Sequence, residues 1–250
     1  MSGHSKWSTI KRKKGAKDAQ RSKLWSRQIR EVTIAARGGG DPAGNSRLRA
    51  AVLAAQSTNM PKDTIERAIK RGTGELAGVV YEEIEYEGYG PGGVAILVET
   101  QTDNKNRTAA EVRHCFTKYN RKLGGAGSVS YLFQRVGQVV IDAGRCAAET
   151  AMEAAIEAGA EDVLEGEGEI VVTTTTEALQ PVTQALQKKG LPVASSELTR
   201  VAQTSVKVAG EEAESLLKLI NALDDLDDVA NVSANFDIDD ADLKALNADL

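Results

Sequence analysis

The sequence predicts an α+β multidomain protein with an N-terminal three-helix domain, then an α+β domain with a ferredoxin-like α+β domain inserted in it. Three observations support this class. Up to Gly72, apolar residues recur at the spacing of amphipathic helices. From Val79 the pattern changes to short strands with glycine-rich connections. Later, the order strand-helix-strand-strand-helix-strand is the split βαβ arrangement of ferredoxin-like domains.

The first helix is expected over residues 20–37, before the glycine-, proline- and asparagine-containing segment GGGDPAGN. Its apolar face comprises Trp25, Ile29, Val32 and Ala36. The opposite face carries Lys23, Arg27, Arg30 and Arg37, together with Ile34. Trp25 is therefore expected to lie in the core.

The second helix is expected over 46–56, and the third starts at Pro61, a favourable residue in a first helical turn. Lys70 and Arg71 occupy the last turn of the third helix, where cations complement the helix dipole. Gly72 then provides the stop signal. Three short helices with short connections predict a small helical domain.

The remaining elements are expected as alternating strands, helices and loops. The first are strands at 81–90 and 93–102, a loop at 103–108, a helix at 109–119 and a loop at 121–130. Next come a strand at 138–141, a helix at 147–158, strands at 161–164 and 169–175, a helix at 177–189 and an extended segment at 192–203. A helix at 211–223 and a strand at 229–236 end the series. The last two could pair with the strands at 80–101, which makes the middle domain discontinuous. The predicted domains are 1–78, 79–134 plus 207–250, and 135–206.

Charge is distributed very unevenly along the chain. The first 72 residues hold seventeen Lys or Arg and five Asp or Glu, a charge of about +12, while the other 178 hold fourteen and thirty-one, about −17. A basic block of this density is typical of a polyanion-binding protein. The alternative is a solvated helical face. The excess of positive charge is large and limited to one end of the chain, however, which favours nucleic acid as the partner.

The candidate nucleic-acid-binding residues follow from this block, because Lys and Arg neutralise phosphates and release counterions. They are Lys6, Trp7, Lys11, Arg12, Lys13, Lys14, Lys17, Arg21, Lys23, Arg27, Arg30, Arg47 and Arg49. Trp7 either stacks on a base or packs back on the helical domain, and the sequence leaves both open.

Other motifs give no catalytic site, metal site or cofactor. Residues 88–93 match GxGxxG, but a strand rather than a helix follows, so we expect a wide hairpin connection. His114 and Cys115 are adjacent and point in different directions on one helix, which argues against a zinc site or a nucleophile pair. The aspartates of the tail (Asp224, Asp225, Asp227, Asp228, Asp237, Asp239 and Asp240) lack the EF-hand pattern, so we expect a solvated surface.

Composition indicates a cytoplasmic protein that does not enter a membrane. No apolar run approaches the roughly 20 residues of a membrane span, and the N-terminus has no apolar signal region. Two cysteines are too few and too far apart for a disulfide framework. Oligomeric state does not follow from the sequence.

Several strings closely resemble the YebC/PmpR family across the whole length. They are GHSKW, KRKKGAKDAQR, RLRAAVLAAQSTNMPKDTIERAIKRGTG, YEGYGPGGVAILVETQTDNKNRTAAEVRH and LGGAGSVSYLF. The resemblance implies a helical domain, two α+β domains with the ferredoxin-like one inserted in the second, and a DNA-binding transcriptional regulator. The start at GHSKW is the one we expect of a bacterial member.

Two functions share the same basic surface. The resemblance favours a DNA-binding transcriptional regulator, and it also implies the alternative of a translation factor bound to ribosomal RNA and the ribosome. No helix-turn-helix or zinc module supports specific base readout, so shape-driven or nonspecific binding is easier to defend. An enzyme with an unrecognised acidic site is a third, remote hypothesis.

Overall fold

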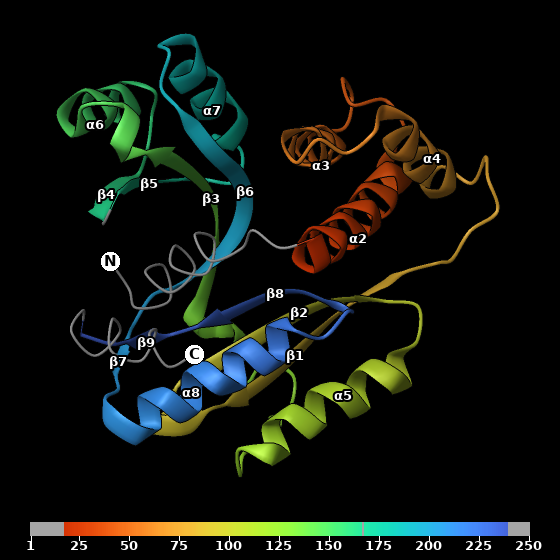
Figure 1. Ribbon diagram of the computed structural model, residues 1–250, viewed down its shortest axis with the longest axis vertical. Helices are drawn as coiled ribbons and strands as arrows, with labels where there is room; N and C mark the ends of the chain where they lie inside the picture. Colours follow the sequence, from red (N-terminus) through yellow and green to blue (C-terminus); the bar gives the residue numbers. More distant parts are fainter. Residues whose placement is uncertain (1–17, 167, 240–250) are drawn as a thin grey trace.

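The computed structural model describes residues 18–166 and 168–239, which form three groups of elements (Figure 1). We call them the helical unit, the three-stranded unit and the four-stranded unit. In Figure 1 the helical and four-stranded units lie on one side of the sheet of the three-stranded unit, while its own helices cover the other side. In the described part of the chain, no helix has the length and apolarity required to cross a bilayer. The α+β multidomain class predicted from the sequence is confirmed.

The helical unit contains three helices around a small core of its own. They are α2 (Asp18–Ala35), α3 (Ser46–Ser57) and α4 (Lys62–Gly72), with a 3-10 turn η1 (Ala36–Gly38) after α2. The Asn45 side chain caps α3 by accepting a hydrogen bond from the Leu48 amide at 3.1 Å. Pro61 lies at the N-cap of α4, just before the first turn predicted for it. Packing favours glycine at position 72, because a Cβ there would lie 2.2 Å from the Thr33 carbonyl oxygen.

An exposed segment, residues 73–80, joins the helical unit to the rest of the chain. Val80 on this segment keeps 72% of its surface exposed. We call this segment the linker.

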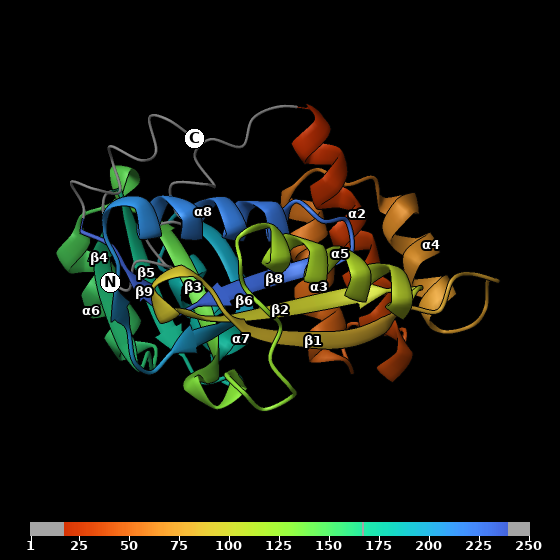
Figure 2. The same ribbon diagram turned by 90° about the horizontal axis from the view of Figure 1, so that it is seen from below.

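The three-stranded unit is built from two distant parts of the sequence. Its strands are β1 (Glu82–Tyr89), β2 (Ala95–Thr102) and β8 (Val229–Ala234), paired antiparallel in the order β1-β2-β8. Helices α5 (Lys105–Lys118) and α8 (Gly210–Asp224) lie along one face of this sheet (Figure 2). A short parallel pair, β7 (Val206–Lys207) with β9 (Phe236–Asp237), completes the unit. The expected pairing of the C-terminal strand with the first hairpin is confirmed.

The connection between β1 and β2 is the predicted glycine-rich hairpin. It contains the 3-10 turn η2 (Pro91–Gly93). Gly92 and Gly93 have φ of 69° and 75°, which glycine adopts without the strain of other residues. A Cβ on Gly92 would also lie 2.4 Å from Val208 Cγ1.

Helix α5 begins earlier than the sequence analysis placed it. Residues 103–108 were expected to be a loop, but the helix starts at Lys105. Asn104 is the N-cap, and its side chain accepts from the Arg107 amide at 3.1 Å. The polar run is therefore mostly the exposed first turn of a helix.

The four-stranded unit has the ferredoxin-like topology predicted for it. Its elements are β3 (Phe133–Asp142), α6 (Ala148–Glu157), β4 (Asp162–Gly166), β5 (Glu169–Thr174), α7 (Leu179–Lys188) and β6 (Val193–Ala202), with 3-10 turns η3 (Ser130–Leu132) before β3 and η4 (Ala143–Arg145) after it. The antiparallel strand order β4-β5-β3-β6 is that of the split βαβ fold. Strand β3 starts at Phe133 rather than 138, because its first half pairs with the end of β6. The precise boundaries after residues 78, 134 and 206 stay predictions.

Candidate nucleic-acid interface

Part of the predicted basic surface lies outside the described residues. This applies to Lys6, Trp7, Lys11, Arg12, Lys13, Lys14 and Lys17. Arg21 is described only as backbone of α2. The structure places the side chains of the other five candidates: Lys23, Arg27, Arg30, Arg47 and Arg49.

Lys23, Arg27 and Arg30 form a stripe on α2, because spacings of four and three residues return to the same side of a helix. We call this stripe the basic face of α2. Opposite it, on the side predicted to be apolar, Val32 and Ala36 are buried with Trp25 and Ile29 packed against them. The Trp25 indole also donates to the Thr58 carbonyl at 3.3 Å. Trp25, expected to lie in the core, is half-buried and packs against the core of the helical unit.

The basic face of α2 contacts residues 224–228, the last residue of α8 and the four after it, which we call the acidic loop. Lys23 Nζ lies 3.2 Å from Asp225 Oδ1, and Arg27 lies 3.3 Å from Asp224 Oδ1. These two cations are thus paired within the chain.

Arg30, the third cation of the face, reaches the far end of the same loop. It donates to the Asp227 carbonyl and lies 4.0 Å from an Asp228 carboxylate oxygen. Burial lowers the pKa of Arg30 from its ordinary value, although the carboxylate of Asp228 opposes this shift.

The expectation that the acidic tail is a solvated surface is wrong for Asp228. Its side chain is buried and accepts hydrogen bonds from Thr108 Oγ1 at 2.7 Å and Thr102 Oγ1 at 3.1 Å. Arg107 also donates to it at 2.7 Å. Burial raises the pKa of Asp228, but the hydrogen bonds from Arg107, Thr108 and Thr102 outweigh burial and hold it below its ordinary value. Asp228 therefore joins β2, α5 and the acidic loop.

Arg47, at the start of α3, links the helical unit to the three-stranded unit. Its guanidinium lies 2.8 Å from Glu31 Oε1 and 2.5 Å from Glu83 Oε1. Hydrogen bonding to Arg47 lowers the pKa of Glu83. Gln101 of β2 also donates to Glu31. Arg47 is thus engaged within the chain.

Arg49 is engaged within the loop before α3. It donates to the carbonyls of Pro42 at 2.9 Å and Ala43 at 3.0 Å. Its contacts are local and hold the connection between the first two helices.

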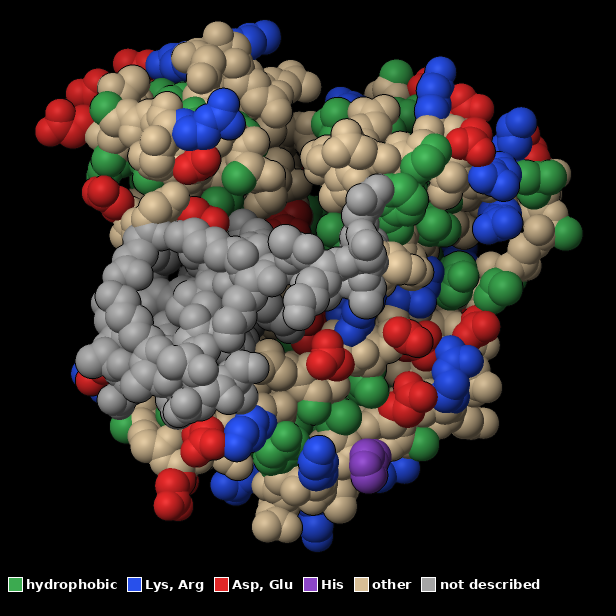
Figure 3. All heavy atoms as spheres, viewed as in Figure 1, with side chains coloured by type: hydrophobic (Ala, Val, Ile, Leu, Met, Phe, Trp, Pro, Cys, Tyr) green, Lys and Arg blue, Asp and Glu red, His purple; other side chains and the backbone are tan. Residues whose placement is uncertain are grey.

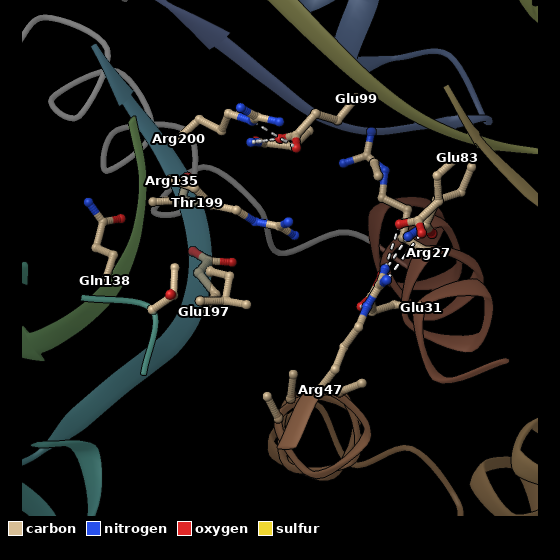
Figure 4. Close-up of a pocket in the computed structure, with 18 of the residues that line it drawn as sticks. Arg27, Glu31, Arg47, Glu83, Glu99, Arg135, Gln138, Glu197, Thr199 and Arg200 are labelled. Carbon is tan, nitrogen blue, oxygen red and sulfur yellow. Dashed lines mark hydrogen bonds and ion pairs between the residues drawn. The ribbon is translucent and has the colours of Figure 1, made fainter. Parts of the chain in front are cut away.

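A cleft of about 800 Å³ lies where the three units meet. Figure 4 shows Arg27, Glu31, Arg47 and Glu83 gathered on one wall, with Arg135 and Glu197 extending from the opposite side. The floor is the polar face of the three-stranded sheet, which includes Glu99 and Asn231.

Arg135 and Arg200 belong to this cleft and were missed by the sequence analysis. They stand opposite one another in the pairing of β3 with β6. Arg200 donates to both Glu85 and Glu99, the second at 3.4 Å, and these glutamates are themselves cross-strand neighbours. Arg200 therefore separates two like charges and joins the two sheets. Strand alternation could have placed each residue on a face, but not against its distant partner.

Exposed cations of the helical unit also gather on α4, where Figure 3 shows Lys and Arg side chains at the upper right. They are Lys62, Arg67, Lys70 and Arg71. Lys62 and Arg67 have acidic partners one turn away. These residues were not among the candidates, although the same charge count could have included them.

His114 and Cys115 behave as the sequence predicted. His114 is exposed on α5, while Cys115 is buried in the core beneath that helix. Across the described ranges, His, Cys, Asp and Glu side chains make no group of three suited to a metal ion.

These features define the class of protein: an α+β multidomain protein whose basic helical unit rests on acidic partners in the other units. Two family models match the chain, one over the helical unit and the other over the two units that follow it. The model described as the TACO1/YebC protein N-terminal domain matches residues 5–75, and that of the TACO1/YebC second and third domain matches residues 81–236. The chain belongs to the TACO1/YebC family, as its resemblance to YebC/PmpR proteins predicted.

Individual relatives agree with this assignment over almost the full length. A "probable transcriptional regulatory protein" of Acidithiobacillus ferrooxidans is 57% identical over 249 residues and covers 99% of both chains. A protein of the same description from Geobacter sulfurreducens is 56% identical over 98% of this chain and 100% of its own. The crystal structure of a conserved hypothetical protein from Aquifex aeolicus is 49% identical and superposes with a TM-score of 0.84, covering 89% of this chain and 93% of that one.

Proposed function

We propose that this chain is a nucleic-acid-binding regulator of gene expression, specifically a DNA-binding transcriptional regulator. The observation that carries the proposal is the similarity, over nearly the full length, to proteins described as probable transcriptional regulators. Those descriptions are of regulators and not of enzymes. The charge of about +12 on the first 72 residues independently favours a polyanionic partner.

The proposed contact surface combines the N-terminal basic residues with the basic face of α2. Phosphate contacts of this kind position a protein on a duplex, whereas base contacts would specify a sequence. We therefore expect affinity that depends strongly on salt and weakly on sequence.

Salt dependence tests the surface directly. We predict that replacing Lys11, Arg12, Lys13 and Lys14 by Ala weakens binding to a short DNA duplex. If all four contact phosphates, the slope of log K against log salt should fall by up to about 3.6, since each phosphate contributes about 0.9. Fluorescence anisotropy over a series of salt concentrations measures both quantities.

A matched control carries four cation-to-Ala changes in other parts of the chain, at Lys188, Lys189, Lys207 and Lys218. It should retain most of the slope. If the two variants behave alike, the N-terminal cations are not the contact surface.

The nature of the target is tested in living cells by crosslinking followed by sequencing of DNA and RNA. Crosslinks at a limited set of promoters would support transcriptional regulation. Crosslinks concentrated on ribosomal RNA would contradict it and assign the same basic surface to translation.

A further inference from the structure

The basic face of α2 is already covered by an anionic segment of the same chain. Lys23, Arg27 and Arg30 span about 10 Å along the helix at 1.5 Å per residue. The acidic loop contacts all three of them through carboxylates or carbonyls. It presents successive oxygen acceptors along the stripe, as the phosphates of a nucleic acid would.

The fit between the two surfaces leaves groups unsatisfied. Among the described residues, the Nε atoms of Arg27 and Arg30 are both buried and have no hydrogen-bond partner. A buried donor without a partner is unfavourable, because it has lost water and gained nothing in return. The loop is therefore a replaceable partner for these guanidinium groups, and a phosphate with several acceptor oxygens is a stronger one.

The helical unit is also built in a way that permits separation. Among the described residues, its apolar core draws only on residues of the helical unit itself. It meets the other units through polar contacts such as Arg47 with Glu83 and Arg37 with the Tyr81 carbonyl. The exposed linker joins it covalently to β1. Interfaces of this polar kind within a chain commonly allow relative motion.

We propose that the acidic loop is an intramolecular competitor of nucleic acid for the basic face of α2. This proposal rests on the proposed function, since it assumes that nucleic acid binds the helical unit. Full engagement of Lys23, Arg27 and Arg30 then requires α2 to leave the loop. In the docked state the carboxylates of Asp224 and Asp225 occupy Arg27 and Lys23 and repel phosphates.

Neutralising the loop tests this competition by equilibrium binding. The variant D224N/D225N removes the two carboxylates that pair with Arg27 and Lys23 but leaves the buried Asp228 in place. It should bind a short DNA duplex about fivefold or more tightly than the wild type, within the usual range of coupled equilibria. Thermal unfolding verifies that the variant is folded.

The control E153Q/E165Q makes the same change in net charge at exposed positions of the four-stranded unit. Its affinity should change by less than about twofold, below the usual range for coupled sites. Adding R27A to D224N/D225N should remove part of the gain, because one of the two uncovered cations is then missing.

Carbodiimide crosslinking gives a readout on the wild-type chain that needs no loop variant. This reagent joins an amine to a carboxylate in contact with it, so Lys23 and Asp225, at 3.2 Å, should form an amide. The crosslinked peptide is quantified by mass spectrometry with and without saturating duplex. Bound DNA should reduce its yield, while the crosslink between Lys189 and Glu157 on the four-stranded unit should persist.

The outcomes separate the two proposals. Tighter binding by D224N/D225N together with loss of the Lys23–Asp225 crosslink supports the competition. DNA binding that is equal in all variants, with an undiminished crosslink, overturns the competition and leaves the proposed function standing. If neither DNA nor RNA of the same sequence binds any variant, both the function and the competition fail.

Discussion

The side chain of Glu87 is predicted to hold the loop that precedes the four-stranded unit. This residue lies on β1 and is 6% exposed. Its carboxylate accepts hydrogen bonds from the amides of Gly127 and Val129 at 2.7 Å and Ser130 at 2.8 Å. One carboxylate thus satisfies three backbone amides of the loop that leads into β3.

The substitution E87Q keeps the size of the side chain but replaces an accepting oxygen by a donating NH2 group. At least one charge-assisted hydrogen bond is lost, and two donors then face each other. Hydrogen bonds to charged groups contribute about 1.5–3 kcal/mol each, so we expect local stability to fall by about 2–3 kcal/mol. Because 1.4 kcal/mol corresponds to a factor of ten, amide exchange of Gly127, Val129 and Ser130 should accelerate by about 30- to 150-fold.

Hydrogen exchange measured residue by residue is the assay, because it reports local opening rather than unfolding of the whole chain. The control is E85Q, two residues earlier on β1, which makes the same change in charge at a half-exposed ion pair with Arg200. That pair is worth about 1 kcal/mol or less, and the loop amides should be unaffected. Equal loop exchange in E87Q and the wild type would refute the role assigned to Glu87.

The pH dependence of the same loop follows from the pKa of Glu87. Burial raises this pKa, but the hydrogen bonds from Val129, Gly127 and Ser130 outweigh burial and leave it below its ordinary value. The unfolded value is about 4.3. Because its pKa is lowered in the folded state, the ionised Glu87 carboxylate stabilises the folded loop above about pH 4.3. This contribution is lost as the pH falls through the folded-state pKa. Loop protection, corrected for intrinsic exchange, should therefore decline in acid in the wild type and lack this step in E87Q.

Two further substitutions test the packing of the units. R47A should lower the free energy of unfolding, measured with urea, by about 1–2 kcal/mol. The value is modest because this arginine and its glutamate partners are at least one-third exposed. R47K should be more stable than R47A but less stable than the wild type, since lysine lacks the fork geometry of the guanidinium. G92A should cost about 1–3 kcal/mol, because its φ is positive and its Cβ would collide with Val208. G125A, where a Cβ would meet no described atom within 4 Å, is the control for the glycine change.

Local patterns predicted the elements well because their causes are local. The ferredoxin-like order followed from alternation, helical spacing and glycine-rich turns between Gln138 and Gln203. The start of α5, expected at residue 109 and found at Lys105, had a readable signal in Asn104, whose side chain caps the first turn. The polar composition of that turn favoured a loop, since its exposed side contains no apolar residue to show the helical period.

The partners of the charged residues could not be read from the sequence. Arg27 and Arg30 contact residues 197 positions away, and Arg200 contacts a residue 115 positions away. Periodicity places a cation on a face but does not say which distant carboxylate meets it. The aspartates of the acidic loop were therefore interpreted as solvated, whereas tertiary packing buries Asp228 and places Asp224 and Asp225 against α2.

The linker has a consequence for how strongly any outside molecule must bind α2. A short tether keeps two surfaces at an effective concentration on the order of millimolar. Under the proposed competition, a single phosphate or a short oligonucleotide would have to displace the acidic loop at this effective concentration. A long polyanion would gain from several contacts at once. Cutting the chain between Ala77 and Val80 would remove the advantage of the loop, since rebinding would then depend on the concentration of the two fragments. Under the proposed competition, a short tether would therefore favour extended, multivalent ligands over small ones.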